Sequence, residues 1–195
     1  MRYLKNYKLF ENNNIEYIRM LISNHKLKEF IDEMDILYKN SDFENINQTL
    51  IMTANYCDYD MTKILIDEYK ADVNCIDNES KYMKLTPLIR TSDIDIMKLL
   101  LENGANVNHC SSNGKNILIY EASYSDSNTN DRIIFLLDLF LQYDIDLNMK
   151  DNDGYDFLDY LEKDKQDKIL SWLDENYPDE YFKYMKNKNI EKFNI

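Results

Sequence analysis

Residues 85–108 read L-T-P-L-I-R-T-S-D-I-D-I-M-K-L-L-L-E-N-G-A-N-V-N, and this stretch decides the fold. It contains two apolar segments. The first follows Thr86, which can cap a helix, and Pro87, whose fixed φ suits the first helical position. The second occupies 94–101, and Gly104 follows it where a left-handed residue would end a helix. The stretch therefore predicts two consecutive helices joined by a short turn.

Parts of this pattern recur at a regular interval. Triplets of an acid or amide, an apolar residue and an asparagine end at Asn74, Asn108 and Asn148, so they lie 34 and 40 residues apart. The longer interval includes a polar stretch at 123–130, which we expect to be a loop between two helices. An interval in this range is typical of proteins built from stacked helical repeats.

The second apolar segment recurs as well, since a similar order of apolar, acidic and basic residues is found at 15–22 and 59–66. These features closely resemble the ankyrin repeat, in which T-P-L-H-x-A opens a first helix, G-A-D-V-N follows a second, and the period is about 33 residues. The resemblance is strong over 48–160 and weak at both ends. It implies an all-α ankyrin-repeat solenoid, in which helix-turn-helix repeats are joined by β-hairpin-like fingers.

The resemblance implies a single domain over 1–195. Core repeats would occupy 48–160, between an N-terminal cap with an extra helix at 1–47 and C-terminal cap helices at 161–195. We interpret 15–22 as the second helix of a degenerate first repeat. The helix before it would present one apolar face, formed by Tyr3, Leu4, Tyr7 and Phe10.

Two further helices are expected outside the core repeats. Apolar residues at three- and four-residue steps predict an amphipathic helix over 26–39, which either covers the core or forms a docking feature. Pro178 suits the start of a final helix, with Asp179 and Glu180 in its first turn as the helix dipole favours. The apolar residues of that helix would cover the last repeat; they are Tyr181, Phe182, Tyr184 and Met185.

The chain departs from the family at several positions. The histidine after T-P-L is missing, and the equivalent residues are Ile51, Ile89, Ile119 and Asp159. We therefore expect packing to hold the repeats together. Lys70 and Asp144 stand where glycine is usual, although aspartate tolerates the left-handed region better than most residues. Gly114 and Gly154 follow triplet asparagines at positions where a hairpin turn needs a positive φ.

Composition and charge limit the function classes. The formal net charge is −13, whereas nucleic acids and anionic membranes bind basic surfaces, so we expect neither as a partner. The most apolar run, 133–141, is too short to span a bilayer. The three cysteines are widely spaced and suggest no disulfide framework, and the start of the chain lacks a signal-peptide core. We expect a soluble, cytoplasmic protein that is a monomer on its own.

The sequence contains no familiar catalytic motif. His109-Cys110, with Cys75 one repeat earlier, comes nearest to a zinc site but lacks a fourth ligand. Residues 151–154, D-N-D-G, suggest a calcium loop, but its first and last positions would be Met149 and Tyr160, which cannot ligate as carboxylates do. A finger turn is the better account. We therefore expect no enzyme activity, no cofactor and no metal.

The resemblance implies a protein-binding module, because fingers and the exposed faces of first helices contact the ligand in this family. Candidate partner-binding residues on fingers are Tyr82, Lys84, Ser112, Lys115, Asn152 and Tyr155. Those on or beside first helices are Asn55, Tyr56, Ser123, Tyr124 and Tyr160. We expect Tyr82, Tyr124 and Tyr155 to contribute most to partner affinity, since tyrosine is common among residues that dominate interfaces. An AT-rich genome would also enrich tyrosine.

Two roles stay open for such a module. One is a scaffold that grips a protein in its concave face. The alternative is a regulatory or inhibitory subunit, or a host-targeting effector, that occludes an enzyme or immune factor. The segment 144–180 has 13 acids and four lysines. It is either a solvated face or an acidic patch that steers a partner with a basic surface.

Overall fold

The computed structural model describes residues 14–78, 82–124 and 129–193. The predicted apolar face of Tyr3, Leu4, Tyr7 and Phe10 lies outside these ranges. Within them all regular secondary structure is helical, as expected for an all-α repeat protein. The chain divides into two compact units, Met1–Ala105 and Asn106–Ile195. Each unit is described separately below.

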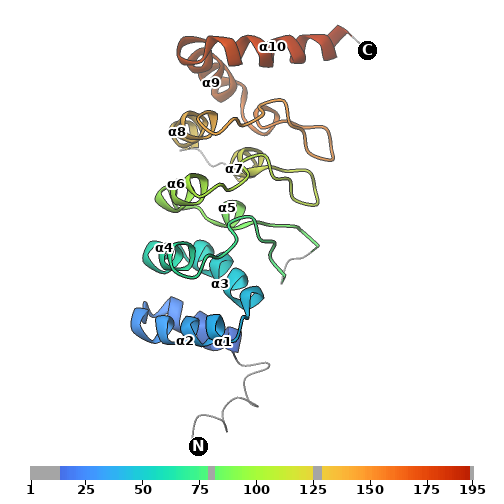
Figure 1. The fold of residues 1–195 in the computed structure, drawn as a ribbon. Helices are drawn as coiled ribbons and strands as arrows, with labels where there is room; N and C mark the ends of the chain where they lie inside the picture. The colour runs from blue at the N-terminus through green and yellow to red at the C-terminus, as the bar shows by residue number, and fades with distance from the viewer. Residues whose placement is uncertain (1–13, 79–81, 125–128, 194–195) are drawn as a thin grey trace, which may run out of the picture. The chain divides into compact units, whose positions relative to one another are not determined.

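Unit 1 consists of helices in consecutive antiparallel pairs (Figure 1). In chain order they are α1 (Asn14–Ser23), α2 (Leu27–Lys39), α3 (Phe43–Asn55), α4 (Tyr59–Asp67), α5 (Pro87–Arg90) and α6 (Ile94–Glu102). First helices stack on first helices, since α3 packs on α5, and second helices stack on second helices, since α4 packs on α6. The predicted helix–turn–helix over residues 85–108 is therefore confirmed.

The N-terminal part of unit 1 differs in detail from the prediction. Residues 15–22 do form a helix, α1, and it packs on both α2 and α3. The helix expected as an addition at 26–39 is thus the partner of α1 within one helical pair. The interpretation of 15–22 as a second helix is therefore wrong, because α1 comes first in its pair and stacks on the first helix α3. The proposed domain boundary at 47/48 falls inside α3, which begins at Phe43 after the N-cap Asp42.

Two aspartates that the sequence analysis did not single out cap helices of unit 1. Asp58 accepts a hydrogen bond from the Met61 N–H at the start of α4. Asp93 does the same for α6 through the Ile96 N–H. Thr86 occupies the N-cap position of α5, but its side chain makes no capping bond. Its buried Oγ1 has no hydrogen-bond partner within the described residues, so the predicted N-cap position is confirmed but the side chain does not cap the helix.

Unit 2 contains α7 (Ile117–Ser123), α8 (Thr129–Leu141), the 3-10 turn η2 (Leu158–Tyr160), α9 (Lys163–Asn176) and α10 (Pro178–Phe193). α7 packs on α8 and on η2, and α9 packs on both α8 and α10. The first helix of the last repeat is therefore reduced to one 3-10 turn. The final helix begins at Pro178, as predicted.

The apolar face predicted for α10 is only partly correct. Tyr184 is buried, and its ring lies 6.0 Å from that of Phe157. Phe182, in contrast, is 70% exposed, so the prediction that it covers the last repeat is wrong. The reason is geometric, because residues two apart on an α-helix point in nearly opposite directions.

Triplet asparagines supplement the packing between repeats. Ile51 and Ile119, at positions where the family has histidine, are buried in the core. In unit 1 the Asn74 side chain donates to the Gly104 carbonyl over 3.0 Å. In unit 2 Asn108 donates to the carbonyl of Asp144 over 2.9 Å. Two of the three triplets thus add to the packing a hydrogen bond to the turn that ends the next helical pair.

Candidate partner-binding surfaces

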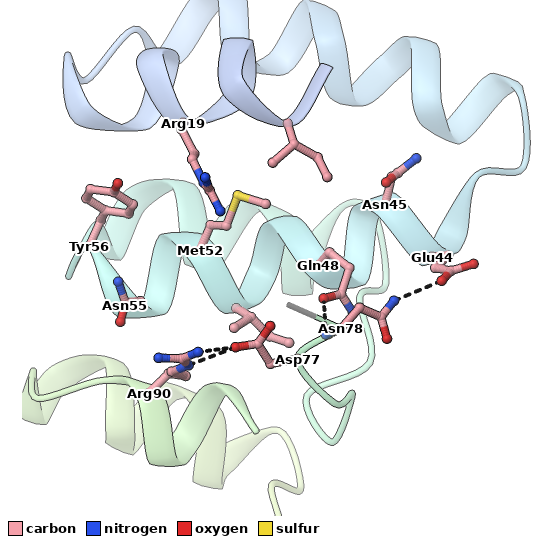
Figure 2. A pocket seen from close by; sticks show the side chains of 12 residues that line it. Arg19, Glu44, Asn45, Gln48, Met52, Asn55, Tyr56, Asp77, Asn78 and Arg90 are labelled. Carbon is pink, nitrogen blue, oxygen red and sulfur yellow. Dashed lines mark hydrogen bonds and ion pairs between the residues drawn. The ribbon is translucent and has the colours of Figure 1, made fainter. Parts of the chain in front are cut away.

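A groove of about 340 Å³ lies along the exposed face of α3 in unit 1 (Figure 2). Its walls come from α1 on one side and from the finger after α4 and the helix α5 on the other. The lining residues, which define the α3 groove, are Ile15, Arg19, Glu44, Asn45, Gln48, Ile51, Met52, Asn55, Tyr56, Asp77, Asn78 and Arg90.

Side chains of α3 hold the start of the finger against this groove. The Gln48 amide donates to the Ile76 carbonyl over 2.9 Å and accepts from the Asn78 N–H over 2.8 Å. The Asn78 side chain in turn donates to Glu44 over 2.8 Å. Both ends of the Gln48 amide are therefore used in fixing the finger. These hydrogen bonds fix this wall of the groove within the free chain.

The charged side chains of the groove are paired within unit 1. The Arg90 guanidinium donates to the buried carboxylate of Asp77 through Nε, over 3.0 Å, and through a second nitrogen. Arg19 contacts Glu16 over 2.8 Å. Glu44 accepts a hydrogen bond from Asn78 and has no arginine partner among the described residues. The lining contains two arginines and two acids, so the groove carries little net charge although the chain is strongly acidic.

Asn55 and Tyr56, both predicted from the sequence, lie at one end of the α3 groove (Figure 2). Sequence reasoning missed the other lining residues. A signal was present on α3, because Asn45, Gln48 and Met52 precede Asn55 at three- and four-residue steps on the side opposite the buried residues. The contributions of α1 and of the finger depend on tertiary contacts and had no such signal.

Tyr82 and Lys84 lie elsewhere in unit 1, on the long finger that precedes α5. Tyr82 is 83% exposed, and Lys84 is exposed with a φ of 53°. The finger closes through a hydrogen bond from the Asp77 N–H to the Leu85 carbonyl, over 2.9 Å. Tyr82 is therefore displayed to solvent as predicted, but it does not line the groove that contains Asn55 and Tyr56.

In unit 2, two neighbouring fingers are fastened to each other. The Asn152 N–H donates to the Asn113 carbonyl over 3.0 Å, and the Asn152 side chain donates to the Ser112 carbonyl over 2.9 Å. Gly114 permits this approach, since a Cβ at that position would lie 2.7 Å from the Asn152 nitrogen. The two fingers therefore form one surface.

The structure brings five predicted site residues together here, and we call them the finger platform: Ser112, Lys115, Asn152, Tyr155 and Tyr160. The Lys115 ammonium lies 4.2 Å from the centre of the Tyr160 ring, within cation–π range. The Tyr155 ring meets the Tyr160 ring edge-on, with centroids 5.9 Å apart. Tyr155 itself is 52% exposed.

Asp151 organises the base of the finger platform. Its carboxylate accepts hydrogen bonds from the N–H groups of Asp153 and Tyr155 and from the Tyr160 hydroxyl. The hydrogen bond to Asp151, followed by burial, raises the pKa of Tyr160 to about 12. The Asp151 carboxylate thus serves the finger turn, which agrees with the sequence interpretation of residues 151–154.

Ser123 and Tyr124, the remaining candidates, lie at the end of α7. The Ser123 hydroxyl donates to the Tyr120 carbonyl over 2.9 Å, so it serves its own helix. Tyr124 is 80% exposed, and its ring stacks on that of Tyr120 with centroids 6.2 Å apart. Of this pair, Tyr124 is the one exposed to solvent.

Metal-ligating and nucleophilic side chains occur across the parts of the chain that the structure describes. Among those residues, no group of three histidine, cysteine or acidic side chains is placed to hold a metal ion. Burial raises the pKa of the Cys75 thiol to about 12, which leaves little nucleophilic thiolate at neutral pH. None of the described helices is both long and apolar enough to cross a membrane.

Comparison with known proteins agrees with this architecture. No family model matches the chain. A protein of Acanthamoeba polyphaga mimivirus, named as a putative ankyrin repeat protein, is 31% identical over 130 residues. The match covers 63% of this chain but 16% of that relative, so the chain corresponds to a small part of it. The similarity, together with the stacked helical pairs of each unit, confirms that the chain resembles the ankyrin-repeat family.

Proposed function

We propose that the chain is a non-catalytic protein-interaction module that binds a protein partner through its fingers and the exposed faces of its first helices. The finger platform is the observation that carries the proposal. Its fingers are joined by backbone and side-chain hydrogen bonds, and Tyr160 is held between Asp151 and Lys115. A surface fixed before binding loses little conformational entropy when it meets a partner.

Exposed tyrosines supply contact area on the finger platform, on the finger of unit 1 and at the end of α7. Tyr82, Tyr124 and Tyr155 are all at least 52% exposed. A tyrosine ring buries a large rigid surface and keeps a polar tip, which suits an interface that must also remain soluble when free. The acidic segment 144–180 favours a partner with a basic surface.

Binding of a native partner tests the proposal. The partner would be isolated by affinity purification of the full chain from its native cell and identified by mass spectrometry. Replacing Tyr82, Tyr124 and Tyr155 together by alanine should weaken binding by at least about 2 kcal/mol, the scale of hot-spot truncations. The melting temperature should barely change, since exposed substitutions usually cost little.

A matched control uses exposed aromatic residues on second helices. Tyr59 on α4 and Phe135 on α8 are also exposed. Their joint replacement by alanine should leave partner affinity unchanged. If the triple variant binds as tightly as the parent, or if the control variant loses as much affinity, the partner does not bind through Tyr82, Tyr124 and Tyr155.

A further inference from the structure

The α3 groove combines an apolar floor with a polar rim. Ile51 is buried, while Ile15 and Met52 are half-buried and face the groove. An incoming aliphatic or aromatic side chain could cover these atoms and gain the usual free energy of apolar burial. The volume of about 340 Å³ is at the lower end of the range for ligand pockets. It suits one large side chain with the adjoining backbone, not a folded surface.

The polar groups that remain available in the groove are uncharged. Within the described residues, no hydrogen bond uses the Asn55 amide or the Tyr56 hydroxyl. Each charged side chain of the lining already has a partner within unit 1: Arg90 pairs with Asp77, Arg19 with Glu16, and Glu44 accepts a hydrogen bond from the Asn78 amide. A carboxamide offers both a donor and an acceptor, which match the C=O and N–H of an extended backbone.

These observations lead to a choice of ligand. We propose that the α3 groove binds an extended, uncharged peptide segment of the partner, which inserts one large aliphatic or aromatic side chain against Met52 and pairs its backbone with Asn55. This inference rests on the proposed function and names the partner chemistry of one surface. A charged residue at the same place would have to leave water for a groove whose own charges are already paired.

Selection from a library tests the inference without knowledge of the partner. Random linear peptides displayed on phage would be selected on the intact full-length chain, and the selected peptides would be synthesised and their affinities measured by fluorescence anisotropy. We expect the selected sequences to share a large apolar residue with uncharged neighbours. Their affinity should change less than about twofold between about 50 mM and about 500 mM NaCl, because screening acts on charged contacts.

Substitutions in the groove identify the site. Met52→Glu and Met52→Lys should each weaken peptide binding by about tenfold or more, since either charge would lose hydration under the bound side chain. Asn55→Ala should weaken it by about fivefold or more, the effect of losing a hydrogen-bonding group. Asn176→Ala is the matched control, because Asn176 is also an exposed last residue of a helix, α9. It should leave affinity unchanged.

Several outcomes would overturn the inference. Selection of charged peptides, or opposite effects of Met52→Glu and Met52→Lys, would show that the groove recognises a charged ligand. Unchanged peptide affinity of Asn55→Ala would show that the peptide does not bind in the groove. Asn55 is exposed, so this variant should fold and keep the test decisive even if a charge at position 52 unfolds the chain. A native partner that needs Tyr82, Tyr124 and Tyr155 but tolerates all groove variants would overturn this inference and leave the proposed function standing.

Discussion

The Tyr184 hydroxyl donates a hydrogen bond to the Asp156 carboxylate over 3.0 Å, inside unit 2. The same carboxylate lies 2.8 Å from the Lys188 ammonium and accepts the Leu158 N–H at the start of η2. One buried acid thus joins α10 to the turn that follows the last finger. It gives the final helix a specific position that apolar packing alone would not define.

Removing the hydroxyl should destabilise unit 2. Tyr184→Phe keeps the ring against Phe157 but deletes a hydrogen bond to a buried carboxylate, so we expect a loss of about 1.5–3 kcal/mol in the free energy of unfolding, measured with urea. Tyr181→Phe on the same helix is the control and should have little effect. Equal stability of both variants and the parent would contradict the role of Asp156 as an anchor.

The attachment of α10 should also depend on pH. Burial alone would raise the pKa of Asp159, but hydrogen bonds from Lys188 and from the Asp156 backbone outweigh it, and the net pKa lies below 3.8. Burial alone would lower the pKa of Lys188, but the bonds to Asp156 and Asp159 raise it above 10.5. These contacts therefore make their full contribution to the free energy of unfolding between the ordinary pKa values of the two groups, 3.8 and 10.5. This contribution is lost as pH falls through the lowered pKa or rises through the raised one.

A comparison of unfolding free energies over pH tests this window. The free energy of unfolding of the parent should exceed that of Lys188→Met by a constant amount between the two ordinary pKa values. This difference should shrink in acid and in strong alkali. A difference that is independent of pH at both ends would mean that the aliphatic chain of Lys188, and not its charge, holds α10.

Because the two fingers of unit 2 are in contact, alanine should be more destabilising at Gly114 than at Gly154. Gly114 and Gly154 have φ values of 81° and 85°, so alanine at either position costs about 1–2 kcal/mol of backbone strain. A Cβ at Gly114 would also collide with the Asn152 backbone, whereas at Gly154 it would meet nothing within 4 Å. Gly114→Ala should therefore be the more destabilising by at least about 1 kcal/mol. Equal losses would mean that the fingers separate freely.

Truncation of the unit 1 core should be costly. Leu88 and Leu100 are 1% and 0% exposed. Leu88→Ala or Leu100→Ala should each reduce the free energy of unfolding by about 2–5 kcal/mol, because each leaves a cavity between stacked repeats. Leu27→Ala, at a position 38% exposed on α2, should cost much less. Melting curves that match the parent for both core variants would show that the register is wrong.

The acidic segment 144–180 gives a kinetic prediction. If it steers a basic partner, the association rate should fall as salt rises while the dissociation rate changes little. Stopped-flow measurements with the purified partner would separate the two rates. Association that is independent of salt would leave these acids as a solvated face.

Much of the fold could be predicted because the repeat is a local pattern. Caps, turn residues and helical periodicity lie within one or two turns of each other in the sequence, so α6 and its Gly104 turn follow from residues 94–104 alone. Which helices pair is a tertiary matter. The residue order at 15–22 predicts a second helix, and this prediction is wrong, because the contacts with α2 and α3 make α1 the first helix of its pair.

The candidate surfaces were predictable to a smaller extent. Tyr155 and Lys115 could be placed on fingers from the repeat spacing, and the structure brings both to Tyr160. Arg19 could not be placed at the α3 groove, because its position depends on how α1 lies against α3. The contact of Arg90 with Asp77 likewise crosses a finger longer than the repeat pattern specifies.

The ties made by triplet asparagines have a consequence for how the chain leaves the ribosome. Asn74 finds its carbonyl 30 residues later, at Gly104, and Asn108 finds its carbonyl 36 residues later, at Asp144. Each amide thus gains its partner as soon as the next helical pair has been synthesised. Contacts of such short range need little of the remaining chain, so within each unit folding can keep pace with translation, starting from the N-terminal side.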